Sequence, residues 1–251
     1  MKVGDYMKSR KVRDLVIVDI NEKERMVIAC DSSGSIGNKR YDLLQVEPFI
    51  TGKYTVRVGL LEILCSGAEV ITIVDNVCAE MEPTGREIIR GINSELKLAK
   101  IDDVPLTGST EENFEVFATG VGITVIGIID KDKLKVNNIK SNSVIYSIGI
   151  PKVGDEIDFY NDNDIFGYET LYEIKDLEGV YEIVPVGSKG ILYEAIGLAT
   201  NNGKKFIQNE NLNVDIKRSC GPATVVIVAI DKSLEDYIKG IKNSCKIGEI
   251  I

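Results

Sequence analysis

The sequence predicts an α/β protein of two domains. Three observations support this fold class: β-branched apolar runs alternate with segments of helical periodicity, 44% of the 251 residues are hydrophobic, and the composition shifts at Pro151–Asp155. A chain of this length and composition can fill a sizeable core. We expect an N-terminal domain over residues 1–150 and a smaller, shortened α/β domain over residues 151–251.

The first elements follow from local patterns. Residues Asp14–Ile20 and Arg25–Cys30 are β-branched runs around a charged turn, which predicts a hairpin. Apolar residues at helical spacing predict a helix over Gly52–Ser66, with Gly67 at its end. A buried strand is expected at Val70–Val74.

The next part of the N-terminal domain begins with a helix. Thr84 and Glu87 have the spacing of a capping box and precede a strong apolar stripe. Residues 106–112 are expected to form an acidic, glycine-containing loop. Long apolar runs then predict strands over Gly120–Ile129 and Ser143–Ile150.

The second domain continues the alternation of strands and helices. We expect a strand near Tyr181–Val186, a helix from Lys189 to Thr200, a strand at Ala223–Ile230 and a terminal helix from Ser233.

Composition excludes several functions. The 30 basic and 39 acidic residues give a net charge of -9, which argues against a nucleic acid partner. No apolar run approaches the roughly 20 residues of a membrane span, and the N-terminus lacks the apolar core of a signal peptide. We therefore expect a cytoplasmic protein with no membrane partner.

The reactive residue types are also limited. The five cysteines are scattered without a C-x-x-C pair, and the chain has no histidine. Ser-His-Asp and Cys-His arrangements are thereby excluded. Catalysis would have to use carboxylates, lysine, metal ions and positioning.

Three short segments, which we call stations, each contain an acidic residue close to a glycine: Asp31–Gly37, Leu61–Ala68 and Leu106–Glu112. Carboxylates are ligands that Mg²⁺ takes one or two at a time, with phosphates and waters completing its shell. Glycines let backbone N–H groups approach phosphate oxygens. The chain contains no P-loop motif, so the stations predict magnesium-nucleotide chemistry on a different fold.

The order of these stations resembles the superfamily of aminoimidazole ribonucleotide synthetase, selenophosphate synthetase and thiamine-monophosphate kinase. Asp14, the strand end at Asp31, the helix string Gly59–Ala68 and the loop Thr107–Thr110 match its motifs in order. The resemblance implies a two-domain aminoimidazole ribonucleotide synthetase-like fold of the α/β (α+β) class. It also implies a homodimer in which the N-terminal sheets pair into a barrel, with ATP bound near the interface.

Within that superfamily, three fuller strings look like the α-ribazole kinase family of cobalamin biosynthesis. They are Ala29–Gly37, Glu80–Gly85 and Pro105–Phe114. This resemblance implies transfer of the ATP γ-phosphate to the ribose 5′-hydroxyl of α-ribazole.

The chain departs from the superfamily pattern at three positions. Glu62 stands where relatives usually have aspartate, and Ser109 stands where they have an acid. Lys189 falls where thiamine-monophosphate kinases have an acid, which argues against thiamine phosphate as the substrate.

The candidate site residues fall into three groups. The predicted magnesium ligands are Asp14, Asp31, Glu62 and, as a secondary candidate, Asp75. The predicted nucleotide-binding residues are Gly34, Gly37, Gly108, Ser109 and Thr110. The predicted catalytic residues are Glu111, for the acceptor hydroxyl, and Lys189, for the transferred phosphate.

Simpler interpretations stay open for each group. Asp31 could cap its turn, Asp14 could pair with Arg13 or Lys11, and Glu111 or Glu112 could be ordinary loop acids. The function also has two alternatives. The protein could be a kinase of the same fold with another nucleoside or a thiamine-like alcohol as acceptor, or a non-catalytic ATP-binding sensor.

Overall fold

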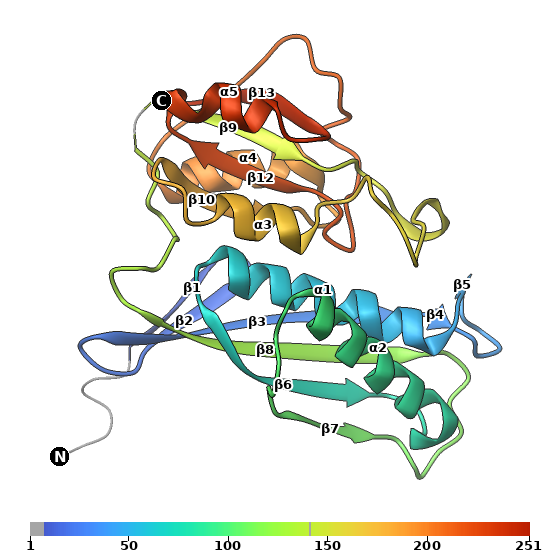
Figure 1. The fold of residues 1–251 in the computed structure, drawn as a ribbon. Coiled ribbons are helices and arrows are strands. Elements are labelled where there is room, and N and C mark those ends of the chain that lie inside the picture. Colours follow the sequence, from blue (N-terminus) through green and yellow to red (C-terminus); the bar gives the residue numbers. More distant parts are fainter. Residues whose placement is uncertain (1–7, 141) are drawn as a thin grey trace. The chain divides into compact units, whose positions relative to one another are not determined.

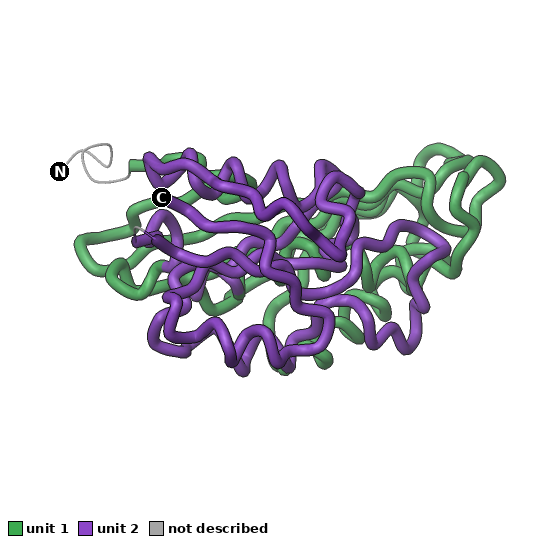
Figure 2. Tube along the Cα trace, turned by 90° about the horizontal axis from the view of Figure 1, so that it is seen from above, with its two compact units in different colours: residues 1–64, 68–134 green, residues 65–67, 135–251 purple. Residues whose placement is uncertain are grey.

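The computed structural model describes residues 8–140 and 142–251, which form two compact units (Figures 1 and 2). The first unit extends to Leu64 and includes Ala68–Leu134, and the second comprises Cys65–Gly67 and Lys135–Ile251. The units divide earlier in the chain than the predicted boundary at residue 150. The reason is that strand β9 (Ser143–Ile148) is the central strand of the second unit's sheet.

The first unit is built on a six-stranded sheet of order β1-β2-β3-β8-β6-β7. All neighbours are antiparallel except β6 and β7, which are parallel. The strands are β1 (Ser9–Val12), β2 (Leu15–Asp19), β3 (Glu24–Gly34), β6 (Glu69–Val77), β7 (Leu106–Thr110) and β8 (Gly120–Asp130). A parallel pair, β4 (Ile36–Gly37) and β5 (Leu44–Gln45), follows β3.

The predicted hairpin is confirmed as β2 and β3, and the predicted strand after the first helix is confirmed as β6. The expected loop at 106–112 is wrong for most of its length, because residues 106–110 form the edge strand β7. Three polar residues in five give this strand little apolar periodicity, so the backbone pairing with β6 determines its structure.

Helices α1 (Pro48–Cys65) and α2 (Arg86–Leu98) lie on one face of this sheet (Figure 1). They approach each other closely at two glycines. A Cβ atom on Gly52 would lie 2.1 Å from the carbonyl oxygen of Ile88, and one on Gly91 would lie 2.0 Å from that of Phe49. The buried Arg57 and Glu95 form an ion pair at 3.3 Å between the same helices.

The predicted capping box at the start of α2 is wrong. The hydroxyl of Thr84 donates a hydrogen bond to the Glu80 carboxylate, and the helix has Gly85 as its N-cap without a side-chain cap. A π-helical turn, η1 (Met81–Gly85), precedes α2 and uses the residues that the motif assigns to the cap.

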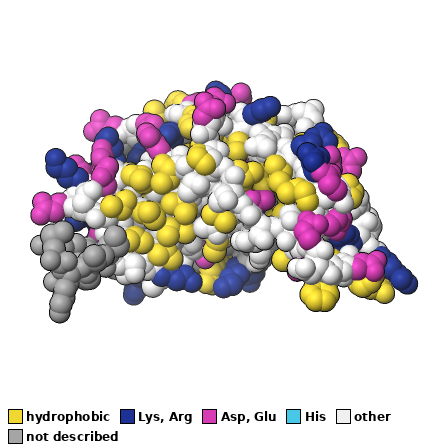
Figure 3. All heavy atoms as spheres, turned by 90° about the horizontal axis from the view of Figure 1, so that it is seen from below, with side chains coloured by type: hydrophobic (Ala, Val, Ile, Leu, Met, Phe, Trp, Pro, Cys, Tyr) yellow, Lys and Arg dark blue, Asp and Glu magenta, His cyan; other side chains and the backbone are white. Residues whose placement is uncertain are grey.

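The two faces of the first sheet differ in burial. Val121, Ile123 and Val125 of β8 are buried on the face that carries the helices. On the opposite face the strands present partly exposed apolar side chains, and Figure 3 shows hydrophobic side chains gathered there. We call this surface the open face; it includes Val16, Val18, Met26, Ile28, Ile126 and Ile128. Over the described residues the sheet is not closed into a barrel, because β1 and β7 are its two edges.

The second unit is built on an antiparallel sheet of order β10-β12-β9-β13-β11. Its other strands are β10 (Val180–Pro185), β11 (Phe206–Gln208), β12 (Val226–Ile230) and β13 (Ser244–Ile250). Its helices are α3 (Tyr168–Ile174), α4 (Gly190–Asn201) and α5 (Glu235–Lys239), with short 3-10 turns η2 (Gly154–Glu156) and η3 (Lys232–Leu234).

Helix α4 packs on one face of this second sheet through Ile191, Ala195 and Leu198, which share a core with Ile145 and Ile227. The predicted strand at 181–186 and the helix at 189–200 are confirmed. The helix expected to be terminal is followed by β13. In the part of the chain that the structure describes, no helix has the length and apolar character needed to cross a membrane.

Candidate functional site

Two predicted metal ligands lie in one row across the first sheet. Asp31 on β3 and Asp75 on β6 both pair with Ile123 of the strand between them. Directly opposite residues in a sheet point to the same face, so both carboxylates are on the helix-covered side with the buried Ile123. The Cα atoms of the two acids are separated by two strand spacings, roughly 10 Å.

Burial makes ionisation of the two carboxyl groups in this row unfavourable. Burial is the main cause that raises the pKa of Asp31; the backbone N–H of Ser32 lowers it in part, and the charge of Asp14 raises it further. Burial also raises the pKa of Asp75, which is only 4% exposed, although its own backbone N–H lowers it in part. Carboxylates whose ionised form is penalised by burial are stabilised by a bound cation.

Gly108 on β7 lies against this row. It pairs with Asp75, and a Cβ atom at position 108 would lie 2.0 Å from both the backbone oxygen and the Oδ1 atom of Asp75. The glycine therefore makes room for the Asp75 carboxylate. Gly108 was predicted to bind phosphate, and its contact with Asp75 is an additional reason for a glycine here.

The two other predicted metal ligands lie at different places. Asp14 is exposed in the turn between β1 and β2, near enough to influence the pKa of Asp31. Glu62 is buried on α1 with 8% exposure. Its neighbour Ile63 packs against Gly127, four residues along β8 from Ile123, so Glu62 lies at another level of the sheet.

The two glycines predicted at the end of β3 differ in their surroundings. A Cβ atom on Gly34 would meet nothing within 4 Å. One on Gly37 would lie 2.8 Å from Oδ2 of Asp42, a buried acid that accepts hydrogen bonds from the N–H and hydroxyl of Thr119 at 2.7 Å. Gly34 is therefore open to a ligand, while Gly37 accommodates a buried hydrogen-bond network.

The residues at the end of β7 line a pocket of about 500 Å³. Ser109 and Thr110 contribute hydroxyls to it, and Phe114 contributes an aromatic ring that is 77% exposed. The Thr110 hydroxyl donates to Glu112 at 2.8 Å. Glu111, also in the lining, accepts hydrogen bonds at one carboxylate oxygen from the N–H groups of the next loop residues, Asn113 at 2.7 Å and Phe114 at 3.2 Å.

Lys189 belongs to the second unit. It is the N-cap of α4, and its ammonium donates a hydrogen bond to the Tyr193 hydroxyl at 3.1 Å and lies 4.3 Å from the ring centroid. The predicted lysine is therefore exposed at the strand-to-helix turn and engaged with an aromatic ring of its own helix.

Sequence analysis missed a partly buried lysine in the first unit. The Lys39 ammonium donates to both oxygens of Glu80, at 3.0 and 2.8 Å, and its side chain is 14% exposed. Burial raises the pKa of Glu80, but hydrogen bonds from Lys39 and Thr84 outweigh it and leave a lowered pKa. The signal was available, since Lys39 follows the glycine station at Gly37 by two residues.

Sequence analysis also missed an aromatic pair. The rings of Tyr41 and Phe117 have centroids 5.9 Å apart, and the Arg40 guanidinium lies 5.2 Å from the Tyr41 centroid. A backbone hydrogen bond from Tyr41 to Phe117 at 2.8 Å joins their loops. Because these rings are far apart in the sequence, only the fold reveals the pair.

Magnesium fits the donor set of this region in part. Asp31 and Asp75 are carboxylates, the ligand type of which Mg²⁺ takes one or two in nucleotide sites. Within the described ranges, no group of three or more acidic, cysteine or histidine side chains is arranged to hold a metal ion. A magnesium ion here would therefore need phosphates and waters as its other ligands.

Comparison with known proteins supports the superfamily resemblance. Residues 12–129 match the family model described as AIR synthase related protein, N-terminal domain. No curated protein sequence matches the chain.

Solved structures show the same fold at low sequence identity. Thiamine monophosphate kinase from Aquifex aeolicus has a TM-score of 0.66 and 11% identity, over 96% of this chain and 89% of that one. AaThiL complexed with AMPPCP and TMP has a TM-score of 0.62 and 12% identity, over 94% and 84%. T. maritima PurL complexed with ADP has a TM-score of 0.68 and 16% identity, over 97% of this chain but 42% of that longer chain. The overall fold is therefore that of AIR synthase-related, thiamine monophosphate kinase-like structures.

Proposed function

We propose that the protein is an ATP-dependent kinase that phosphorylates the ribose 5′-hydroxyl of α-ribazole. The observation that supports this best is the row formed by the half-buried Asp31 and the buried Asp75, beside Gly108. The shared fold with a structure complexed with AMPPCP and TMP supports nucleotide binding. The three strings that resemble α-ribazole kinase support the acceptor.

Asp31 and Asp75 would hold magnesium in this proposal, with Asp14 and Glu62 as further candidate ligands. Bound magnesium would neutralise phosphate charge and orient the triphosphate. The burial that raises the pKa of both row aspartates favours a bound cation. Gly108 keeps the space that the Asp75 carboxylate needs.

The nucleotide would lie at the strand ends next to the row. Ser109 and Thr110 would hydrogen-bond its phosphates, with Gly34 and Gly37 at the end of β3 as further candidates. Apolar walls and the Phe114 ring of the 500 Å³ pocket suit a heterocycle.

Two residues have proposed catalytic roles. The Glu111 carboxylate would orient the acceptor hydroxyl and accept its proton, since a carboxylate can act as base within hydrogen-bond reach. Lys189, from the C-terminal domain, would neutralise charge on the transferred phosphoryl group. Phosphoryl transfer requires mainly positioning and electrostatic stabilisation, so the lack of histidine is no obstacle.

A homodimer is part of the proposal, with a second copy on the open face. That face presents apolar side chains from three neighbouring strands, in a protein whose net charge is -9. Contiguous apolar surface of this kind is typical of protein interfaces. Ile28→Asp should produce a monomer in light scattering, whereas Ile207→Asp, on an exposed part of the second unit, should not. Equal masses for both variants and the wild type would contradict the dimer.

Two alternatives have specific motivations. A different acceptor, such as another nucleoside or a thiamine-like alcohol, would keep the same fold and ATP site. A non-catalytic ATP sensor is favoured by Ser109, which supplies a hydroxyl on β7 where the resemblance expects an acid.

The test is magnesium-dependent ADP release from ATP with α-ribazole, thiamine monophosphate or a panel of nucleosides, with each product analysed for added phosphate. Turnover with α-ribazole alone is the expected result. Turnover with another acceptor would change the substrate, and ATP binding without turnover for any acceptor would favour the sensor.

A further inference from the structure

The second unit contains a separate slot of about 450 Å³ between α3 and the residues that follow α5. Three separate stretches of the chain contribute to its walls, including the end of β9 at Ile148 and Gly149. Its volume is within the range of small-molecule sites. The functional site described above uses none of its residues.

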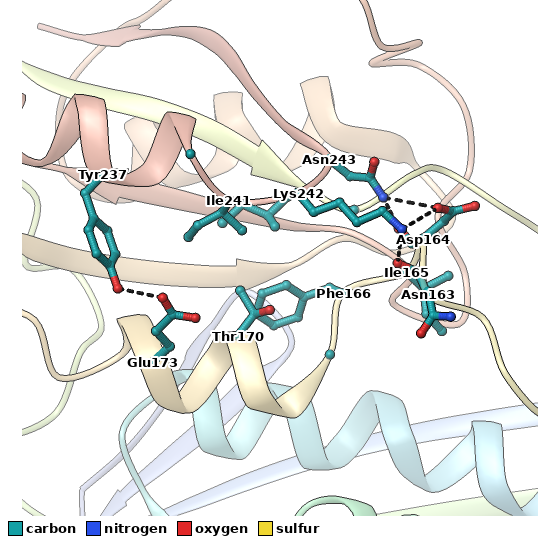
Figure 4. Close-up of a pocket in the computed structure, with 14 residues that line it drawn as sticks. Asn163, Asp164, Ile165, Phe166, Thr170, Glu173, Tyr237, Ile241, Lys242 and Asn243 are labelled. Carbon is teal, nitrogen blue, oxygen red and sulfur yellow. Dashed lines mark hydrogen bonds and ion pairs between the residues drawn. The ribbon is translucent and has the colours of Figure 1, made fainter.

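The middle of the slot is apolar. Phe166 is 2% exposed and is fixed by a backbone hydrogen bond from its N–H to the Thr224 carbonyl at 2.8 Å. Figure 4 shows Phe166 below and Ile241 above the central part of the slot. Because the Phe166 ring is almost fully buried beneath the surface, a flat apolar group here would contact mainly Ile241, which is half-buried.

One end of the slot is a hydrogen-bonding pair. The Tyr237 hydroxyl donates to one oxygen of Glu173 at 2.6 Å (Figure 4). A carboxylate accepts several hydrogen bonds, so Glu173 retains capacity for donors from a ligand. The hydrogen bond to Glu173 raises the pKa of the Tyr237 hydroxyl. This end therefore suits a ligand with hydroxyl groups.

The other end is rigid and electrically balanced. Asp164 forms ion pairs with Lys152 at 3.2 Å and Lys242 at 3.3 Å, and Asn243 donates to its backbone oxygen at 3.1 Å. Lys152 also pairs with Asp162 at 2.9 Å. Two lysines thus match two aspartates here.

The slot therefore has a net negative charge, which is that of the Glu173 carboxylate. A phosphate group would be repelled by it, and both nearby lysines are already paired with carboxylates. An uncharged ligand with a flat apolar part and hydroxyl groups is not repelled by Glu173 and needs no lysine to neutralise it.

We propose that this slot binds an uncharged nucleoside, with the base against Ile241 and ribose hydroxyls donating to Glu173. The choice of a nucleoside rests on the proposed function, because the acceptor of that reaction is a nucleoside before phosphorylation. The slot itself is identified from its shape and charge.

Calorimetric titration of the whole chain, without ATP, tests this inference with α-ribazole and adenosine as probes. Glu173→Gln should weaken nucleoside binding by about tenfold, the loss expected for one hydrogen bond to a charged group. Glu169→Gln is the matched control, since it removes the same charge from an exposed position on the same helix. Thr170→Trp should abolish binding by filling the slot.

α-Ribazole 5′-phosphate should bind the wild type more weakly than α-ribazole, and circular dichroism should show that all variants are folded. Failure of both nucleosides to bind would overturn the inference, as would equal affinity of the Glu173→Gln and Glu169→Gln variants. The proposed function fails separately. Slot-dependent binding without phosphate transfer would disprove the kinase alone, and phosphate transfer to α-ribazole together with nucleoside binding that Glu173→Gln leaves unchanged would disprove the slot alone.

Discussion

Asp31 and Asp75 in the first unit and Asp162 and Asp164 in the second are all partly or fully enclosed acids, but their pKa values move in opposite directions. Burial raises the pKa of Asp31 and of Asp75. Lys152 lowers the pKa of Asp164 by hydrogen bonding. Burial raises the pKa of Asp162, but Lys152 together with backbone N–H groups outweighs it and leaves a lowered pKa.

The opposite directions of these pKa shifts distinguish two roles of a buried or half-buried aspartate. The second unit supplies a lysine for its aspartates, so these ion pairs fix the loop around Asp162 and need no ligand. The first unit places its row on a buried face, where ionisation is penalised. In the function proposed above, the row stabilises a bound cation rather than the fold, and the following predictions test that proposal.

The largest expected effect is on catalysis. Asp31→Asn and Asp75→Asn should each lower magnesium-dependent ADP formation by about 100-fold or more, the usual loss when one charge-stabilising group is removed. Asp162→Asn is the control and should retain turnover. Initial rates at saturating ATP measure this. Similar rates for all three variants would show that Asp31 and Asp75 matter no more for turnover than Asp162 does.

Gly108→Ala should have the next largest effect. The new methyl group would collide with the backbone and carboxylate of Asp75, at a cost of about 1–3 kcal/mol in the free energy of unfolding. Turnover should fall with it, because Asp75 must move. Gly34→Ala places a methyl group in open space and should leave urea unfolding unchanged. Unchanged unfolding of Gly108→Ala would show that Asp75 does not depend on this glycine.

Loss of the Lys152 ammonium should lower the stability of the protein without lowering its turnover. Lys152→Met leaves the Asp162 side chain, 2% exposed, without its cation, and should lower Tm by roughly 5 °C. ATP turnover at 25 °C should stay within twofold of the wild type. Thermal unfolding and a rate assay measure the two effects, and a large loss of turnover at unchanged Tm would contradict the structural role.

Part of this account could be predicted from the sequence. Asp31 was selected because glycines follow it in a motif of the superfamily, and Asp75 because it follows a buried strand; both patterns are local. The alignment of the two aspartates through Ile123 depends on the register of β3, β8 and β6, which no local pattern encodes. Lys39 and Glu80 likewise meet only because two loops converge at one end of the sheet.

The same reason explains the errors. Residues 106–110 contain too few apolar side chains to indicate a strand, and pairing with β6 makes them one. Thr84 and Glu87 match a capping box, but Glu80 takes the Thr84 hydroxyl. In both segments, contacts with residues distant in the sequence or outside the motif determine the local structure.

The smallest expected effect is on the pH dependence of stability without magnesium. Because Asp31 and Asp75 have raised pKa values in the folded state, the unfolded chain releases their protons first. Their contribution to stability is complete below the ordinary value of 3.8 and is lost as the pH rises through the folded pKa values. Asp164, with a lowered pKa, should contribute above that value and lose its contribution as the pH falls.

Thermal unfolding between about pH 3 and pH 7 measures this difference. Asp75→Asn should flatten the loss of Tm with rising pH, and magnesium with ATP should offset it in the wild type. A wild-type and Asp75→Asn pair with parallel Tm curves would show that Asp75 is not penalised by burial.

The most direct test of the central claim is the magnesium dependence of ATP binding to the wild type and to the Asp31→Asn, Asp75→Asn and Asp162→Asn variants, measured by calorimetry. We expect magnesium to strengthen ATP binding in the wild type and in Asp162→Asn, and this gain to be lost in the two row variants. An equal gain in all four proteins would show that the metal binds elsewhere and that the row of Asp31 and Asp75 is not the magnesium site.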